Sequence, residues 1–354
     1  MIRRPPQPVK RQFSLFAGRL QKAGFGLFPT LSGPEILPIQ SVWLLGRAPL
    51  TQEGYPGNSP FRRGWDKCLL WSRAPMIENR AVALVDESNG TANASGGRVT
   101  LRFELDIAGE HLSFGVQIVR GQIRLSDIIP LVRSLSEKLC QAALRKLHAE
   151  GSEVPCRKGC AACCNYLVPL SVPEAFRLQE DLSSLPVEQG RKMLHACLSA
   201  AGKILEKKPD IFTCEEPRET DGQEMTSRTS KWYAGLNLSC PFLSDNACIS
   251  YGNRPIACRE HFVTTPAALC VAGTTPEPSV VPMPVSILEC LGQLASELEQ
   301  REVEAVALPL ALPWALKNHD RSGCTWPTAM MVERFIEILK AAVAKSHTPD
   351  AVHV

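Results

Sequence analysis

Closely spaced cysteines are the residues of this chain best suited to chemistry. Seven of the fourteen fall in two runs, the first only nine residues long, namely Cys156, Cys160, Cys163, Cys164, Cys240, Cys248 and Cys258. A soft metal ion binds several thiolates at about 2.3 Å, and short gaps let one loop supply them. Thiolates brought together without a cation would repel one another and lose their hydration. The spacing therefore predicts a metal site built from both runs.

Other residues could extend or limit this ligand set. Cys163 and Cys164 are adjacent, so in a strand one would be a ligand and the other a core residue, whereas other geometries allow both to bind. His261 could add a nitrogen, although an exposed polar histidine is the simpler interpretation. Further ligands could come from Cys214, Cys270 or Cys290. Ordinary packing or surface roles are predicted for Cys68, Cys140, Cys197 and Cys324.

Length and composition indicate a globular protein that works inside the cell. The 354 residues suffice for two ordinary domains, and the hydrophobic fraction of 44% fits a folded chain. A net charge of +3 and an aromatic content of 6% do not favour nucleic-acid binding. No apolar segment resembles a signal peptide or a membrane span. We therefore expect a cytoplasmic protein with reduced thiols, no membrane association and an unknown protein partner.

Four regions follow from the patterning, and together they predict an α+β fold. Residues 1–95 are basic and rich in Pro and Gly, and we expect an irregular or disordered region there: a tail, a transit peptide or the product of a start codon placed too early. Residues 96–150 predict a β hairpin and a connecting helix. Residues 151–270 form the cysteine-cluster metal-binding domain, and residues 271–345 are C-terminal helices packing on it.

Periodicity locates the elements that must position the cysteines. Alternation predicts a hairpin over 98–118, with a short third strand at 122–125. Helices are predicted from a Ser126 cap to Ala149, from the Ser171–Glu174 capping box to Leu182, over 187–207, over 285–306, and from Thr325 to Ala344. Residues 209–239 are expected to be irregular. This architecture is a small antiparallel β hairpin or meander followed by an α-rich, metal-stapled domain.

The two cysteine runs also carry a recognisable motif. The first run reads Cys156-x3-Cys160-x2-Cys163-Cys164, and the second begins Cys240-Pro241-Phe242-Leu243 and continues with the residues Cys248, Tyr251, Arg254, Pro255, Cys258 and Arg259. Over roughly residues 154–263 this resembles the YkgJ-like cysteine-cluster family, described as zinc- or iron-chelating domains. The resemblance implies bound zinc or iron. Ser250, at a usually apolar position, and His261, near a usual aromatic, depart from the pattern without removing a thiol.

The other matching residues have physical interpretations of their own. Pro255 fixes the backbone that enters Cys258. Arg254 and Arg259 place positive charge near the thiolates, and Tyr251 could cover the site and donate its hydroxyl group to a sulfur. Each of these residues could equally serve the surface or the packing alone.

Three functions remain open at this point. The first is a zinc- or iron-chelating protein, in which the thiols hold one iron–sulfur cluster plus a zinc ion or two four-cysteine sites. The second is an iron–sulfur redox or protein-modifying enzyme. The first three cysteines have the spacing of radical S-adenosylmethionine enzymes, but Ala162 stands where an aromatic residue commonly precedes the third cysteine. The resemblance to the cysteine-cluster family also implies a modification enzyme, because relatives with this domain take part in flagellin lysine methylation. The third is a metal-folded protein-interaction module. No catalytic residue stands out.

Overall fold

The predicted mixed α+β fold with a small antiparallel β unit is confirmed. The computed structural model describes residues 81–85, 98–207, 222–271, 274 and 276–346. Within them, helices predominate and every sheet is small and antiparallel. Among the helices of these described ranges, none combines the length and the apolar character needed to cross a bilayer.

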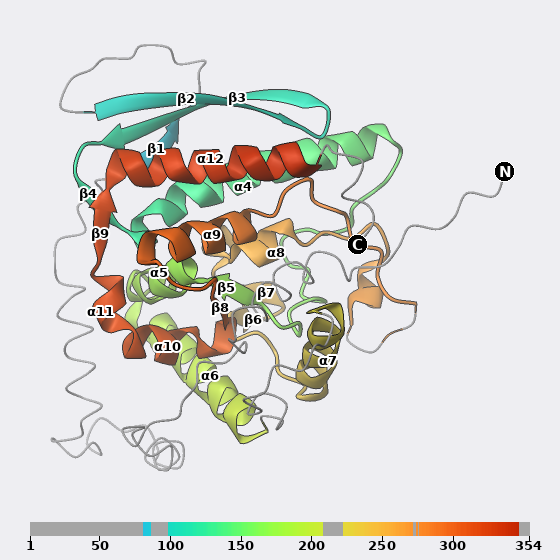
Figure 1. The fold of residues 1–354 in the computed structure, drawn as a ribbon. Coiled ribbons are helices and arrows are strands. Elements are labelled where there is room, and N and C mark those ends of the chain that lie inside the picture. The colour runs from blue at the N-terminus through green and yellow to red at the C-terminus, as the bar shows by residue number, and fades with distance from the viewer. Residues whose placement is uncertain (1–80, 86–97, 208–221, 272–273, 275, 347–354) are drawn as a thin grey trace, which may run out of the picture.

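A three-stranded antiparallel sheet forms one outer layer (Figure 1). Its strands are β1 (Val82–Val85), β2 (Arg98–Ile107) and β3 (Glu110–Val119), in the order β1-β3-β2. The hairpin between β2 and β3 was predicted, and Ala108 and Gly109 close it with positive φ angles. Strand β1 adds four residues of regular structure to the region 1–95, which was predicted to be largely irregular. The rest of that region lies outside the described residues.

Two long helices lie against this sheet. Helices α4 (Ile129–Ala149) and α12 (Thr328–Ser346) run beneath it in Figure 1. Ser126 does not cap α4 as predicted, because a 3-10 turn, η3 (Leu125–Ile128), comes first. The carboxylate of Asp127 accepts from the backbone N–H of Arg124 at 2.8 Å. The Ser126 hydroxyl group is buried and lies 3.0 Å from a carboxylate oxygen of Glu180, so it joins this turn to the next layer.

Further helices lie below α4 and α12 in Figure 1. Helix α5 (Val172–Ser183) begins at the predicted capping box of Ser171 and Glu174, and α6 (Val187–Glu206) closely matches its prediction. Helix α9 (Ile287–Glu299) stops earlier than predicted because Gln300 takes a left-handed conformation. The chain then forms β8 (Ala305–Ala307), which pairs with β5 (Pro169–Ser171). One large apolar core, from Val82 to Val343, connects these layers.

Several short elements complete the fold. Helix α7 (Gly222–Gly235) corrects the prediction that residues 209–239 are irregular, and it buries Tyr233. The predicted third strand is β4 (Gln122–Arg124), and it pairs with β9 (Thr325–Pro327) just before α12. The remaining elements are η7 (Leu308–Leu310), α10 (Ala311–Lys317) and α11 (His319–Ser322).

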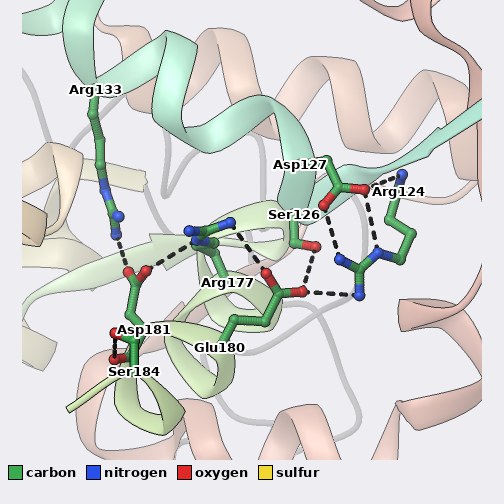
Figure 2. Close-up of polar contacts among 8 residues, drawn as sticks. All are labelled: Arg124, Ser126, Asp127, Arg133, Arg177, Glu180, Asp181 and Ser184. Carbon is green, nitrogen blue, oxygen red and sulfur yellow. Dashed lines mark hydrogen bonds and ion pairs between the residues drawn. The ribbon is translucent and has the colours of Figure 1, made fainter. Parts of the chain in front are cut away.

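A network of charged residues ties α5 to η3 and α4 (Figure 2). Glu180 forms ion pairs with Arg124 at 2.9 Å and with Arg177 at 3.1 Å. Asp181 continues the network through Arg177 at 2.9 Å and Arg133 at 2.6 Å. Because Asp181 and Arg133 are largely shielded from solvent, this pair is screened less than a surface pair. The network fixes the second half of α5 relative to η3 and α4, and the first cysteine run lies in the segment between α4 and α5.

Candidate metal centre

The first cysteine run is a series of turns between α4 and β5. Backbone N–H groups of Cys160, Cys164 and Tyr166 each donate to the carbonyl oxygen three residues earlier, at 3.0 Å. Gly159 has a φ angle of +91°, which only glycine adopts readily. Cys163 and Cys164 therefore do not alternate as in a strand. Both are half-buried in turns, and neither belongs to the apolar core of the described chain.

The second run surrounds a very small hairpin. Strands β6 (Leu243–Ser244) and β7 (Ala247–Cys248) pair across Asp245 and Asn246, which both have positive φ angles. Cys240 precedes this hairpin, and Cys248 ends it. Cys258 follows on a short helix, α8 (Ile256–Glu260).

The two runs meet in space. The backbone N–H of Cys240 donates to the carbonyl oxygen of Cys164 at 2.7 Å. The thiols of Cys163 and Cys164 are in hydrogen-bond contact with each other. Residues separated by some eighty positions therefore share one small region of the molecule.

Backbone donors point at three of the sulfurs. The N–H of Phe242 donates to the Cys240 sulfur at 3.4 Å. The N–H of Ser250 and the N–H of Val263 do the same for Cys248 and Cys156, respectively. Such donors stabilise a thiolate more than a neutral thiol, and hydrogen bonds to sulfur adjust the properties of metal–thiolate sites.

Burial, with a smaller contribution from neighbouring thiols, raises the pKa of most of these cysteines, so they are protonated in the metal-free chain. Burial, and then the charges of Cys240, Cys163 and Cys248, raise the pKa of Cys258 well above its usual value. Burial raises the pKa of Cys240 to about 11, with contributions from Cys248 and Cys163. A bound metal ion must displace these protons, so binding would be tighter at higher pH.

Arg254 supplies positive charge to this region, as the sequence suggested. Burial raises the pKa values of Cys156, Cys248 and Cys258, and contact with Cys164 followed by burial raises that of Cys163. The charge of the Arg254 guanidinium group opposes these shifts in all four cysteines, but it is the smaller effect. The guanidinium carbon lies 4.2 Å from the centre of the Tyr251 ring. Donation from the Tyr251 hydroxyl group to a sulfur remains a prediction.

Buried charged residues hold α8, the helix that carries Cys258. Glu174 accepts from the N–H of Ile256, the first residue of α8, at 2.7 Å. Arg259 donates to the carbonyl oxygens of Gly252 and Arg254, and forms an ion pair with Glu137 at 3.3 Å. Arg259 therefore contacts backbone carbonyl groups and α4, and its effect on the thiols stays a prediction.

Another buried carboxyl group connects α8 to α9. Glu260 accepts from the N–H of Ile287, the first residue of α9, at 2.8 Å. Burial raises the pKa of Glu260 to about 8. Helix α8 is thus held at its beginning by α5 and at its end by α9.

The thiols are chemically suited to zinc or iron, but their side chains are not arranged around one common position for an ion. Seven thiols and several sulfur-directed N–H groups are what a thiophilic metal requires. Within the described parts of the chain, however, no three His, Cys, Asp or Glu side chains are arranged to hold one metal ion. Binding would require thiol side chains to rotate. The structure thus brings the two runs into contact at Cys164 and Cys240, and the role of the seven cysteines as ligands stays a prediction.

The cysteines outside the two runs lie in different environments. Cys197 and Cys290 belong to the large apolar core, and Cys140 belongs to a smaller cluster with Phe262 and Val281. Cys324 is exposed, while Cys68 and Cys214 lie outside the described residues.

His261 is not the exposed histidine that the sequence suggested. Its Nε2 atom is buried, with no hydrogen-bond partner in the described chain, and burial lowers its pKa. Its ring meets Tyr166 edge-on, with 5.7 Å between the ring centres. The buried glutamates that hold α8 were missed, although the capping box at Glu174 was recognised.

Comparisons of this chain with known protein families, with curated proteins and with solved structures found no match.

Proposed function

We propose that this protein binds zinc or iron through its two cysteine runs. The hydrogen bond between Cys240 and Cys164 is the observation that carries the proposal, because it joins two segments that are far apart in the sequence and that each carry several thiols. A cation would neutralise the thiolates and convert binding energy into stability of loops that have little regular structure. The bound group is zinc, iron or an iron–sulfur cluster, as in the cysteine-cluster family that the sequence resembles.

Metal analysis of the full chain, purified without oxygen, tests this proposal. We expect stoichiometric zinc in a colourless protein, or iron and sulfide in a brown protein with absorbance in the visible range. Cys160→Ser and Cys258→Ser should each lower the metal content. Cys324→Ser removes an exposed thiol outside the two runs and is the matched control. Equal metal content in all three variants, or a metal-free wild-type protein, would rule out the assignment.

A further inference from the structure

Strand β2 forms a long edge of the outer sheet. It pairs with β3 along all ten of its residues, and no strand in the described ranges pairs with its other side. A two-residue turn makes Ile107 and Glu110 a hydrogen-bonded pair, and such pairs then alternate along an antiparallel ladder. The main-chain N–H and C=O groups of the even-numbered residues of β2 therefore point to the open edge.

The side chains on this edge are exposed, and their charges are sorted along the strand. The even-numbered residues are, in order, Arg98, Thr100, Arg102, Glu104 and Asp106. Two positive side chains thus come before two negative ones. Charged residues on an edge commonly prevent the addition of another strand. Here their order instead makes the edge complementary to an antiparallel copy of itself, because opposite charges that face each other across two strands attract.

Charge also selects the register in which two copies of β2 would pair. With the two-fold axis between the two Phe103 residues, Arg102 of each copy lies directly opposite Glu104 of the other. An axis at Arg102 or at Glu104 would place like charges opposite each other, and an axis at Leu101 would pair fewer residues of β2. In the Phe103 register the two open edges exchange about eight main-chain hydrogen bonds.

The same register continues the apolar inner face of the sheet. Among the odd-numbered residues of β2, Phe103, Leu105 and Ile107 are buried, whereas Val99 and Leu101 are only half-buried. In the paired sheet, Val99 lies opposite Ile107 of the second copy, and Leu101 lies opposite Leu105 of the second copy. The two partly exposed residues gain apolar neighbours there, so pairing would cover apolar surface as well as main-chain groups.

We propose that two copies of this chain join edge to edge through β2, so that their three-stranded sheets become one continuous antiparallel sheet. The interface is isologous, since the contact between Arg102 and Glu104 occurs twice about a two-fold axis. The partner is thus a second copy of the same chain. This inference does not rest on metal binding, because β2 belongs to the outer sheet in Figure 1 and contains no cysteine.

Charge reversal in the reduced full-length chain tests the register, with sedimentation equilibrium over a range of concentrations as the measurement. Arg102→Glu turns two attractive cross-strand contacts into repulsive ones, so the dissociation constant of the dimer should rise about tenfold, and Glu104→Arg should do the same. The double variant brings opposite charges together again and should return to within about threefold of the wild-type constant. Lys192→Glu is the control, because it makes the same change in charge as Arg102→Glu on α6, at a side chain that is 75% exposed.

Amide hydrogen exchange of the unmodified chain provides a second measurement if a charge variant does not fold. The N–H groups of Arg102 and Glu104 should be protected at concentrations where the dimer forms, and should exchange rapidly after dilution. A wild-type chain that stays monomeric up to its highest soluble concentration refutes the proposal. So does a dimer that neither charge reversal weakens. Equal protection of the two amides at all concentrations would also refute it, because the edge would then be covered within a single chain.

Discussion

Replacing Glu174 should destabilise the protein and disturb the helix that carries Cys258. The carboxylate accepts three hydrogen bonds: from the Ser171 N–H at 3.0 Å, from the Ser171 hydroxyl group at 2.9 Å, and from the Ile256 N–H at 2.7 Å. Glu174 is buried, and so is Ser171, so water cannot replace the lost acceptor without rearrangement. The substitution thus frees the beginnings of both α5 and α8.

The expected loss in the free energy of unfolding depends on two opposing contributions: the hydrogen bonds to Glu174 and the cost of burying its charge. Hydrogen bonds to a charged group contribute about 1.5–3 kcal/mol each, but burying the carboxylate itself costs several kcal/mol. We expect Glu174→Ala to lower the free energy of unfolding by about 3–5 kcal/mol, as when one partner of a buried charged contact is removed. Glu174→Gln keeps one carbonyl oxygen and should cost about 1–3 kcal/mol.

Stability should also depend on pH through this group. Burial raises the pKa of Glu174 above its ordinary value of 4.5. The folded chain therefore binds more protons than the unfolded chain between the two pKa values, so the free energy of unfolding falls as pH rises from 4.5 through that interval. Glu174→Gln should remove this part of the pH dependence.

Urea unfolding of the reduced chain in the presence of a chelator measures these differences without a contribution from metal. Glu188→Gln is the control, because Glu188 lies on the surface of α6 with 64% of its side chain exposed. The reasoning is refuted if Glu174→Ala lies within about 0.5 kcal/mol of that control, the range of ordinary surface substitutions.

Three further perturbations test other parts of the structure. Arg254→Gln should weaken metal binding about tenfold, because it removes the positive charge that acts on four of the thiols, whereas Lys158→Gln should not; competition with a chromophoric chelator measures both, and equal affinities would contradict the role of Arg254. Asp181→Asn should cost about 2–3 kcal/mol in urea unfolding, because the largely buried Arg133 loses the carboxylate with which it pairs while Arg177 keeps Glu180; a neutral result would show that the pair between Arg133 and Asp181 is dispensable. Phe242→Ala should cost about 3–5 kcal/mol, because the ring is fully buried; a loss below about 1 kcal/mol would indicate that the site collapses around the cavity.

Local patterns in the sequence were sufficient to predict the elements that depend only on residues close together in the chain. Alternating apolar residues from Val99 to Ile118 predicted the β2–β3 hairpin, and the Ser171–Glu174 pair predicted the start of α5. Both signals are contained in a few neighbouring residues, so they do not depend on the rest of the fold.

Elements that depend on distant partners were missed. Strand β8 pairs with β5 across more than one hundred residues, and its three residues have no period of their own. Strand β1 is identified only by its register with β3, because four residues cannot establish an alternation. Helix α7 lies in a polar segment, where helix formation depends on the burial of Tyr233 and not on a continuous apolar face.

The candidate metal site was likewise predictable only in part from the sequence. Spacing predicted which cysteines would be neighbours within each run, but contact between the runs depends on backbone bonds such as that from Cys240 to Cys164. Cys270 could not be distinguished from Cys290 by sequence, since both are isolated thiols. Only the fold separates them: Cys290 belongs to the large apolar core, whereas Cys270 is buried outside both apolar clusters of the described residues.

Helix α8 explains why three ionisable side chains are buried near Cys258. Five residues are too few for a helix that is stable in water by itself. Glu174 accepts from its first N–H, Arg259 ties it to neighbouring carbonyl groups, and Glu260 connects it to Ile287. Buried ionisable groups contribute little net stability, so stability alone is a weak reason for three of them around one short helix. Ligand side chains must be held to within about 0.5 Å of their working positions. Under the proposed function, this demand at Cys258 gives the three ionisable residues a common role.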